Sequence, residues 1–293
     1  MNIYQHLLEF FNETPFLIKF AIIVVVVMVI TIIVLIISLK MIRSLLNIKD
    51  KEILGYKKEY EALVVEYLFS EAQTGELSDK QHSIILKIKE DIKVIPRRKS
   101  VITVLSSLMN EVSGEMSDAI QTLYHKTGLI SYAKVRLKSK KWHLVAKAIG
   151  ELRRFKIHEV QDEVSKYINH PRVEVRKEAQ LYLVHLFKFK GLNFLDDLEL
   201  PLSEWHQLQL LEALLNLEDQ KICDIKPWLK SANISVVLFA LKLVKVYNQF
   251  ELKDTLVELL SHPEKEVKLY ASVVLNKLFG YEVAASLKPN YIN

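Results

Sequence analysis

The strongest constraint in the sequence is an apolar run from Phe20 to Leu39 that contains no charged residue, no proline and no glycine. As an α-helix rising about 1.5 Å per residue, a run of this length covers the hydrocarbon core of a bilayer, which is about 30 Å thick. Its Val and Ile residues occupy every side of such a helix, a distribution that suits lipid better than a single buried face. The run predicts a transmembrane helix at 16–40, preceded by a short N-terminal tail at 1–15.

The charges around this run predict its orientation. The cations that follow it are Lys40, Arg43, Lys49, Lys51, Lys57 and Lys58. Because the positive-inside rule keeps such a flank in the cytoplasm, we expect a single-pass membrane protein with its N-terminus outside and the rest of the chain cytoplasmic. The tail carries Glu9 and Glu13 and lacks the basic start of a secretion signal, so we expect no cleavage.

The stretch 41–77 predicts a helical juxtamembrane stalk. Some of its residues recur with the alternating four- and three-residue steps of a coiled-coil seam. The seam positions are Ile42, Leu46, Lys49, Ile53, Tyr56, Tyr60, Leu63 and Tyr67. Three tyrosines and a lysine make a poor zipper, so two alternatives stay open. The stalk either packs against its own domain or pairs with a second copy in a homodimer.

The rest of the chain predicts an all-α fold. Among 293 residues only seven are Gly and seven are Pro, and no tract of turn residues alternates with strand-like Val, Thr and Tyr. Ser78 opens a capped helix that we expect to run to about Ile95 and to stop at Pro96. The single cysteine, Cys223, excludes an intramolecular disulfide framework, and we expect it to pack in the core.

From about residue 129 the sequence repeats itself. A small or apolar residue recurs at a regular interval, and each time a Leu or Val follows four positions later. The repeated positions are Ala148, Ala179, Leu210, Ala240 and Ala271. A period of about 31 residues is typical of stacked helix pairs, each of which cannot bury its apolar face alone. The alanines suit close helix crossings, where only a methyl group lets one backbone approach the next.

Two of these units carry a resemblance to a known family. The segment His170–Ala179 reads HPRVEVRKEA, and His262–Ala271 reads HPEKEVKLYA. In both, a His-Pro turn precedes a helix that carries the repeated alanine, so we expect each histidine to cap its turn rather than to act in catalysis. The units resemble HEAT repeats, and the layout of one span followed by repeats is similar to that of bacterial single-pass HEAT-repeat membrane proteins.

The resemblance implies a fold and a class of function. The fold is an α-solenoid of HEAT-like helix pairs at 129–293, with 78–128 as its helical N-terminal part. The function is a scaffold that binds a protein partner at the cytoplasmic face of the membrane. Some proteins of similar layout are thought to partner envelope glycosyltransferases, so the resemblance suggests such an enzyme as the partner.

Catalysis is not expected from the motifs present. The sequence lacks the HExxH, paired-cysteine and glycine-rich phosphate-loop patterns, so we expect no enzyme activity, no cofactor, no metal and no small-molecule substrate. One alternative is a non-catalytic or regulatory subunit of an enzyme complex. A HEAT-type enzyme acting on nucleic acid is disfavoured, because no aromatic interleaving or reading module accompanies the basic residues.

Charge is unevenly distributed along the predicted repeats. The candidate basic docking surface comprises Lys134, Arg136, Lys138, Lys140, Lys141, Lys147, Arg153, Arg154 and Lys156. Within this window only Glu151 opposes them, so we expect most of these cations to face water or an anionic surface. That surface is either the lipid head groups of the bilayer or an acidic protein, and an ordinary solvated helix face is the remaining alternative.

An acidic segment and three tryptophans complete the pattern. The acidic residues are Asp196, Asp197, Glu199, Glu204, Glu212, Glu218, Asp219 and Asp224, and only Lys221 opposes them. The tryptophans, Trp142, Trp205 and Trp228, recur at unit positions, so we expect them to anchor the packing between helices.

Overall fold

The computed structural model describes residues 15–70, 77–215 and 222–280. Within these ranges every regular element is a helix, which confirms the all-α prediction. Residues 1–14 of the predicted tail, residues 71–76 of the predicted stalk, residues 216–221 and the C-terminal residues 281–293 lie outside the described ranges.

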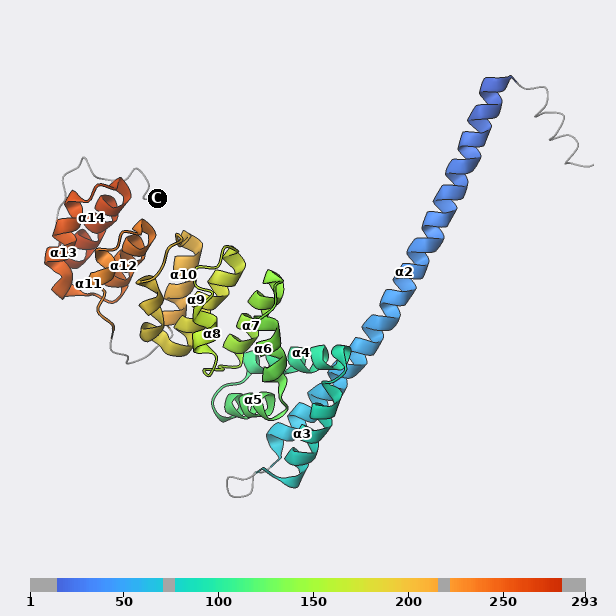
Figure 1. The fold of residues 1–293 in the computed structure, drawn as a ribbon, viewed down its shortest axis with the longest axis horizontal. Helices are drawn as coiled ribbons and strands as arrows, with labels where there is room; N and C mark the ends of the chain where they lie inside the picture. Colours follow the sequence, from blue (N-terminus) through green and yellow to red (C-terminus); the bar gives the residue numbers. More distant parts are fainter. Residues whose placement is uncertain (1–14, 71–76, 216–221, 281–293) are drawn as a thin grey trace, which may run out of the picture.

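The first described element is α2, a single 54-residue helix over Phe16–Phe69. It is long and apolar enough to cross a membrane, and none of its apolar window is buried by the rest of the chain (Figure 1). The predicted boundary between span and stalk at residue 40 is not a structural break, because one helix runs through it. Gly55 lies inside the helix, and a methyl group at that position would meet no atom within 4 Å.

The lower end of α2 packs against the helices that follow it. Tyr60, Val64 and Tyr67 are buried there. Tyr60 Oη donates to Asp91 Oδ2 at 3.0 Å, and the Asp91 carboxylate also binds Arg97 at 2.5 Å. The lower half of the predicted seam is therefore covered by the chain itself. Residues 41–55 are exposed throughout, and the homodimer stays a prediction for that upper half alone.

Helix α3, Asp79–Asp91, begins as predicted with a capping box between Ser78 and Gln81. It ends at Asp91, four residues before the predicted end at Ile95, so that prediction is wrong. Pro96 does not stop α3 but lies in the first turn of α4, Ile95–Glu111. Proline suits this place because the first turn of a helix leaves its N–H groups unbonded in any case.

The remaining helices form a row that leads sideways from the lower part of α2 (Figure 1). The first three are α5 (Glu115–Lys126), α6 (Leu129–Leu137) and α7 (Trp142–Arg154). They are followed by α8 (Gln161–Ser165), α9 (Val173–Phe187), the 3-10 helix η1 (Lys188–Leu195) and α10 (Glu204–Leu215). The last are α11 (Lys226–Leu229), α12 (Ile234–Val246), η2 (Phe250–Leu252), α13 (Lys253–Glu258), η3 (Leu259–Ser261) and α14 (Lys265–Phe279). The starts of the long helices α7, α9, α10, α12 and α14 are evenly spaced along the chain, with the same interval as the repeated residues, which confirms the predicted period.

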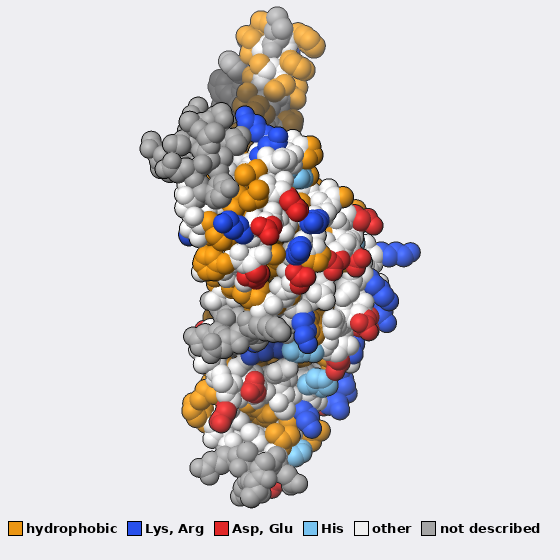
Figure 2. All heavy atoms as spheres, turned by 90° about the vertical axis from the view of Figure 1, so that its left-hand side faces the viewer, with side chains coloured by type: hydrophobic (Ala, Val, Ile, Leu, Met, Phe, Trp, Pro, Cys, Tyr) orange, Lys and Arg blue, Asp and Glu red, His pale blue; other side chains and the backbone are white. Residues whose placement is uncertain are grey.

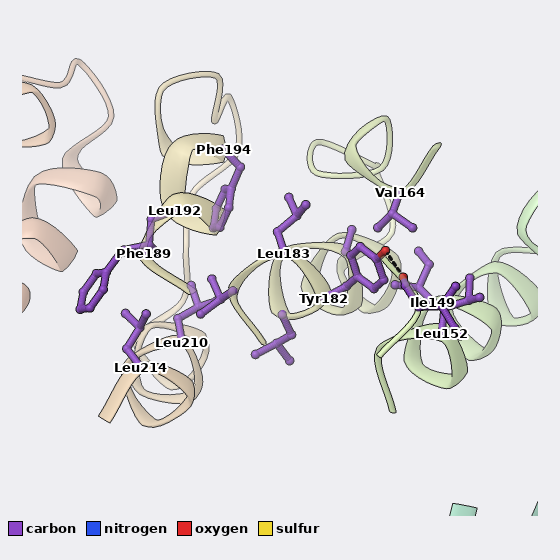
Figure 3. Close-up of a cluster of buried hydrophobic side chains, with 14 of the residues drawn as sticks. Ile149, Leu152, Val164, Tyr182, Leu183, Phe189, Leu192, Phe194, Leu210 and Leu214 are labelled. Atoms are coloured by element: carbon purple, nitrogen blue, oxygen red, sulfur yellow. Dashed lines mark hydrogen bonds between the residues drawn. The ribbon is translucent and has the colours of Figure 1, made fainter. Parts of the chain in front are cut away.

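The repeated residues lie in the core of this row. The four alanines and Leu210 are all fully buried, and the Leu or Val four positions later is buried in every unit. Helix α7 packs on α9, α9 packs on η1 and α10, and α12 packs on α14. Figure 3 shows how side chains of α7, α9, η1 and α10 join in one apolar cluster, in which the Tyr182 hydroxyl donates to the carbonyl of Ile157.

The two His-Pro turns have the same local structure, as predicted. The Nδ1 atom of His170 accepts from the backbone N–H of Arg172 at 3.1 Å, and Nδ1 of His262 accepts from that of Glu264 at the same distance. Each histidine thus satisfies a backbone donor at the start of a long helix, where no carbonyl of the helix is available.

The expectation for the tryptophans is only partly correct. Trp228 is buried, and its Nε1 donates to Asp196 Oδ1 at 2.7 Å, so it is a packing anchor. Trp205 is 65% exposed, and the anchor prediction is wrong for it. The next residue, His206, takes the buried position on α10, where its Nε2 lies 2.7 Å from Gln180 Oε1 of α9. Trp142 is partly exposed, with the guanidinium of Arg172 5.6 Å from its ring.

Candidate functional site

The structure divides the nine cations of the candidate basic docking surface into two groups. The first group comprises four cations that have an ion-pair or hydrogen-bond partner, and three of these partners lie outside the sequence window. Lys134 binds Glu159 at 2.8 Å, Arg153 binds Glu178 at 3.2 Å, and Lys156 donates to Ser117 Oγ at 3.2 Å. The expectation that only Glu151 could oppose these cations is therefore wrong, because Glu159 in the α7–α8 connection and Glu178 on α9 supply further acids.

Arg136 belongs to the same group and has a structural role. Its guanidinium binds Glu151 at 2.7 Å, and the second oxygen of that carboxylate accepts from the hydroxyl of Tyr124 at 2.8 Å. Glu151 is only 4% exposed. Burial, and then the charge of Glu151, raise the pKa of the Tyr124 hydroxyl, which stays protonated and donates. A buried carboxylate needs such partners, so Arg136 is not available for docking.

The second group comprises five exposed cations: Lys138, Lys140, Lys141, Lys147 and Arg154. None of them forms a salt bridge with another described residue. They do not form one patch, because the first three precede α7 and Arg154 is its last residue. The length of α7 separates these ends by about 20 Å.

The C-terminal end of α7 forms one wall of a cleft of about 710 Å³. The other walls are the α4–α5 connection and the C-terminal end of α9. Its basic lining residues are Arg153, Arg154, Lys156, His158, His185 and Lys188, and among the described residues that line it there is no Asp or Glu. We call this hollow the basic cleft. Over the face of the row that Figure 2 turns to the viewer, Lys and Arg side chains are interspersed with Asp and Glu side chains, which contrasts with the lining of the cleft.

Two groups in the basic cleft have unused hydrogen-bonding capacity. The Nε atom of Arg153 is buried and has no partner in the described structure, although the same guanidinium binds Glu178. His185 hydrogen-bonds through Nδ1 to the carbonyl of Leu181 at 2.9 Å, which leaves its Nε2 to other partners. Burial, and then the charge of Arg153, lower the pKa of His185. Because Nδ1 donates to that carbonyl, Nε2 of the neutral ring is an acceptor, and the buried Nε of Arg153 is not accessible, so the positive charge of the cleft comes from its Lys and Arg side chains.

Sequence reasoning missed half of the basic cleft. It identified Arg153, Arg154 and Lys156 but not His158, His185 and Lys188. A partial signal was present, because a lysine lies within two residues after the end of each helix, Lys156 after α7 and Lys188 after α9. Counting charges within one stretch of sequence cannot find residues that only the stacking of two units brings together.

The acidic segment lies in the next part of the row. Its described members, Asp196, Asp197, Glu199, Glu204, Glu212 and Asp224, are all exposed, whereas Glu218, Asp219 and the opposing Lys221 lie outside the described residues. Asp196 and Glu199 line a second hollow, of about 760 Å³, together with Trp228. Much of the basic region and all described members of the acidic region are thus exposed, and the unit of α8 and α9 lies between the two regions along the chain.

Helix α10 adds an exposed apolar face. Trp205, Leu208 and Leu215 are 65%, 50% and 57% exposed, and their spacing puts them on one side of the helix. The opposite side is held by a polar contact network, in which Gln207 accepts from Lys242 of α12 at 2.8 Å and His206 meets Gln180. Burial lowers the pKa of His206 to about 4, so it is neutral there. The apolar face is therefore directed to solvent by a fixed helix.

Other chemistry-bearing groups do not form a site. Burial raises the pKa of the Cys223 thiol to about 11, so at neutral pH it is not the thiolate that a nucleophile requires. In the described part of the chain no group of three His, Cys, Asp or Glu side chains is placed to hold a metal ion.

Comparison with known proteins adds no family to this description. No protein-family model matches the chain, and no curated protein matches it significantly.

Proposed function

We propose that the chain is a membrane-anchored scaffold whose helical row is an α-solenoid of HEAT-like units that binds a protein partner. The observation that carries the proposal is the even recurrence of a long helix along the row, each with its buried residue at the same place. Such units have no closed core of their own and offer an extended surface to a partner. The resemblance of the two His-Pro units to HEAT repeats points in the same direction.

The hydrogen bonds between elements also support this architecture. Tyr167 donates to the carbonyl of Leu137, and Asn233 donates to that of Leu198, 30 and 35 residues away. Trp228 and Asp196 are 32 residues apart. Each of these bonds spans about one unit and joins it to its neighbour, as expected where stability depends on nearest-neighbour contacts.

The proposed anchor is the apolar part of α2, with the helical row in the cytoplasm. The cations that follow the span support this orientation through the positive-inside rule. The row would then extend sideways beneath the membrane, because it leads away from the lower part of α2 (Figure 1).

Single-cysteine labelling tests this topology. In a Cys223→Ser background, a cysteine at Asn2 should react with an impermeant maleimide in intact cells. A cysteine at the exposed Lys140 should react only after permeabilisation. The opposite pattern of labelling would overturn the proposed orientation.

The partner is proposed to be a protein because the stalk holds the row away from lipid. The exposed stretch 41–55 of α2, at about 1.5 Å per residue, separates the span from the first packed residue, Tyr56, by about 22 Å. Charges exposed to solvent act over a Debye length of about 8–10 Å. Anionic head groups are therefore out of reach of the basic residues on α7. The exposed Trp205, Leu208 and Leu215 face instead fits a protein surface.

Site-specific photo-crosslinking in intact cells tests the scaffold. A photoreactive residue at Leu208 should give a discrete adduct, because α10 is proposed to lie in the docking surface. The matched control is Val135 on α6, which is also apolar and exposed but lies on a short helix. Trp205→Ser should reduce the adduct at Leu208. Equal adducts at both positions, or an adduct consisting of a second copy of this chain, would contradict the proposal.

A further inference from the structure

Several of the described units end at a residue whose φ is positive, which is uncommon for residues other than glycine. Lys156 follows α7 with φ 52°, Lys188 follows α9 with φ 58°, and Asn248 follows α12 with φ 50°. Gly280 follows α14 with φ 63°. Four unit ends thus turn with a positive φ, at residues that are about one or two repeat lengths apart.

Lysine is a poor choice for such a turn. Glycine has no Cβ to clash and asparagine tolerates the left-handed region, so both are usual after a helix. Lysine has neither property, and Lys188, with ψ −130°, lies in a region that favours glycine still more strongly. Gly114, with φ 60° and ψ −138°, has nearly the same conformation and lines the same cleft. The turn therefore does not explain the lysines, whereas Asn248 and Gly280 need no further explanation.

What distinguishes these lysines is their place. Lys156 and Lys188 belong to successive units, and both line the basic cleft. Strain retained at particular residues points to a role of their side chains. We propose that the basic cleft binds an acidic peptide segment of the partner protein, with Lys156 and Lys188 as its two principal cations. This inference rests on the proposed scaffold function and specifies that the partner protein binds through an acidic segment.

The lining of the cleft favours carboxylates over a single phosphate group. Phosphate sites commonly use the N–H groups at a helix N-terminus. Here α7 and α9 contribute their C-terminal ends, which present carbonyl groups, and the helix N-terminus in the described lining, that of α5 at Gly114, carries Glu115 and Asp118 in its first turn. The basic side chains must therefore carry the recognition. Their cations come from two separate helix ends rather than converging as a clamp. Successive acidic side chains of an extended peptide can each meet one of them, and Asn110 and Ser113 at the rim can bind its backbone.

Peptide binding by the full-length chain in nanodiscs of neutral lipid tests the inference. The probe is a fluorescent eight-residue peptide of alternating Glu and Ser, and the control peptide carries Gln in place of Glu. At low salt the acidic peptide should bind and the Gln peptide should not. Lys156→Gln with Lys188→Gln should weaken binding by about tenfold. The matched control, Lys138→Gln with Lys140→Gln, removes the same two charges outside the cleft and should leave binding within about twofold.

A second readout separates loss of binding from loss of fold. Lys188→Gly removes the cation and also relieves the backbone conformation. We expect the thermal midpoint to stay unchanged or to rise by about 1–3 °C, while binding of the acidic peptide weakens. A loss of binding that accompanies a higher midpoint cannot be attributed to unfolding.

Several outcomes would overturn the inference. If the control pair weakened peptide binding as much as the cleft pair, the effect would be due to the net charge of the protein rather than to the cleft. Displacement of the peptide by inorganic phosphate at equal concentration would assign the cleft to a phosphate compound. Vesicles of anionic lipid can be added as a competitor of the peptide. If the protein binds these vesicles in preference to the peptide, the cleft is a membrane-binding site. If the peptide does not bind but the Leu208 adduct persists in the Lys156→Gln, Lys188→Gln variant, the cleft inference fails and the scaffold proposal stands.

Discussion

Replacing Gly191 by alanine should lower the free energy of unfolding of the helical row by about 3 kcal/mol, more than an ordinary surface change. Gly191 lies in η1 against the backbone of α9. A Cβ built there would be 2.1 Å from the carbonyl oxygen of Leu183 and 2.9 Å from the backbone nitrogen of Val184. Because the obstacle is helix backbone rather than a flexible side chain, η1 must move away from α9. The cluster that includes Leu192 and Leu210 would then open.

The measurement is thermal unfolding of the detergent-solubilised chain, followed by circular dichroism. A loss of this size corresponds to roughly 6–12 °C in the midpoint. Gly55→Ala provides the matched control, because its added methyl group meets no atom within 4 Å and improves helix propensity. We expect its midpoint to be unchanged or slightly raised. A Gly191→Ala midpoint within about 2 °C of the unaltered chain, the effect of a surface change, would mean that η1 does not pack as described.

Removing the partner of the buried carboxylate should have an effect of similar size. Arg136→Met is expected to cost about 3 kcal/mol, because Glu151 is left buried with Tyr124 as its remaining partner. Most of that loss reflects the unpaired charge rather than the strength of the ion pair. The same thermal measurement applies, and the midpoint should fall at neutral pH.

Two further variants separate the causes. Lys138→Met removes a nearby cation that is exposed and has no acid partner among the described residues, so it should leave the midpoint within about 1 °C. Arg136→Met combined with Glu151→Leu removes the buried charge as well, and should recover much of the stability lost in the single variant. If Lys138→Met destabilised as much as Arg136→Met, net charge rather than the buried pair would be responsible.

The sequence predicted best what depends on spacing along the chain. The period of the long helices, the buried alanines and the capping role of His170 and His262 all follow from local patterns that a helix imposes on its own residues. Pro96 was misread because a proline can either stop a helix or lie in the first turn of one, and spacing alone does not distinguish these two roles.

What spacing did not predict depends on contacts between units. Glu159, in the α7–α8 connection, pairs with Lys134 of α6, and Glu178 of α9 pairs with Arg153 of α7. Lys188 joins Lys156 only because α9 stacks on α7. Trp205 and His206 differ by a single position, and only the direction of α10 relative to α9 and α12 decides which of them is buried. Such contacts are set by the crossing of whole helices, for which a single sequence carries no direct signal.

The continuity of α2 joins the proposed anchor rigidly to the helical row. A helix without an interior proline transmits rotation and tilt along its length instead of absorbing them at a hinge. Transmembrane helices tilt by about 20° on average, and the tilt depends on bilayer thickness. The lower end of α2, where it packs against the row, would lie about 45 Å from the bilayer centre, so a tilt of this size would displace it sideways by roughly 15 Å. The thickness of the surrounding bilayer would thus influence the lateral position of the helical row. Gly55 is the residue of α2 at which the helix would bend most easily, because glycine has a low helix propensity.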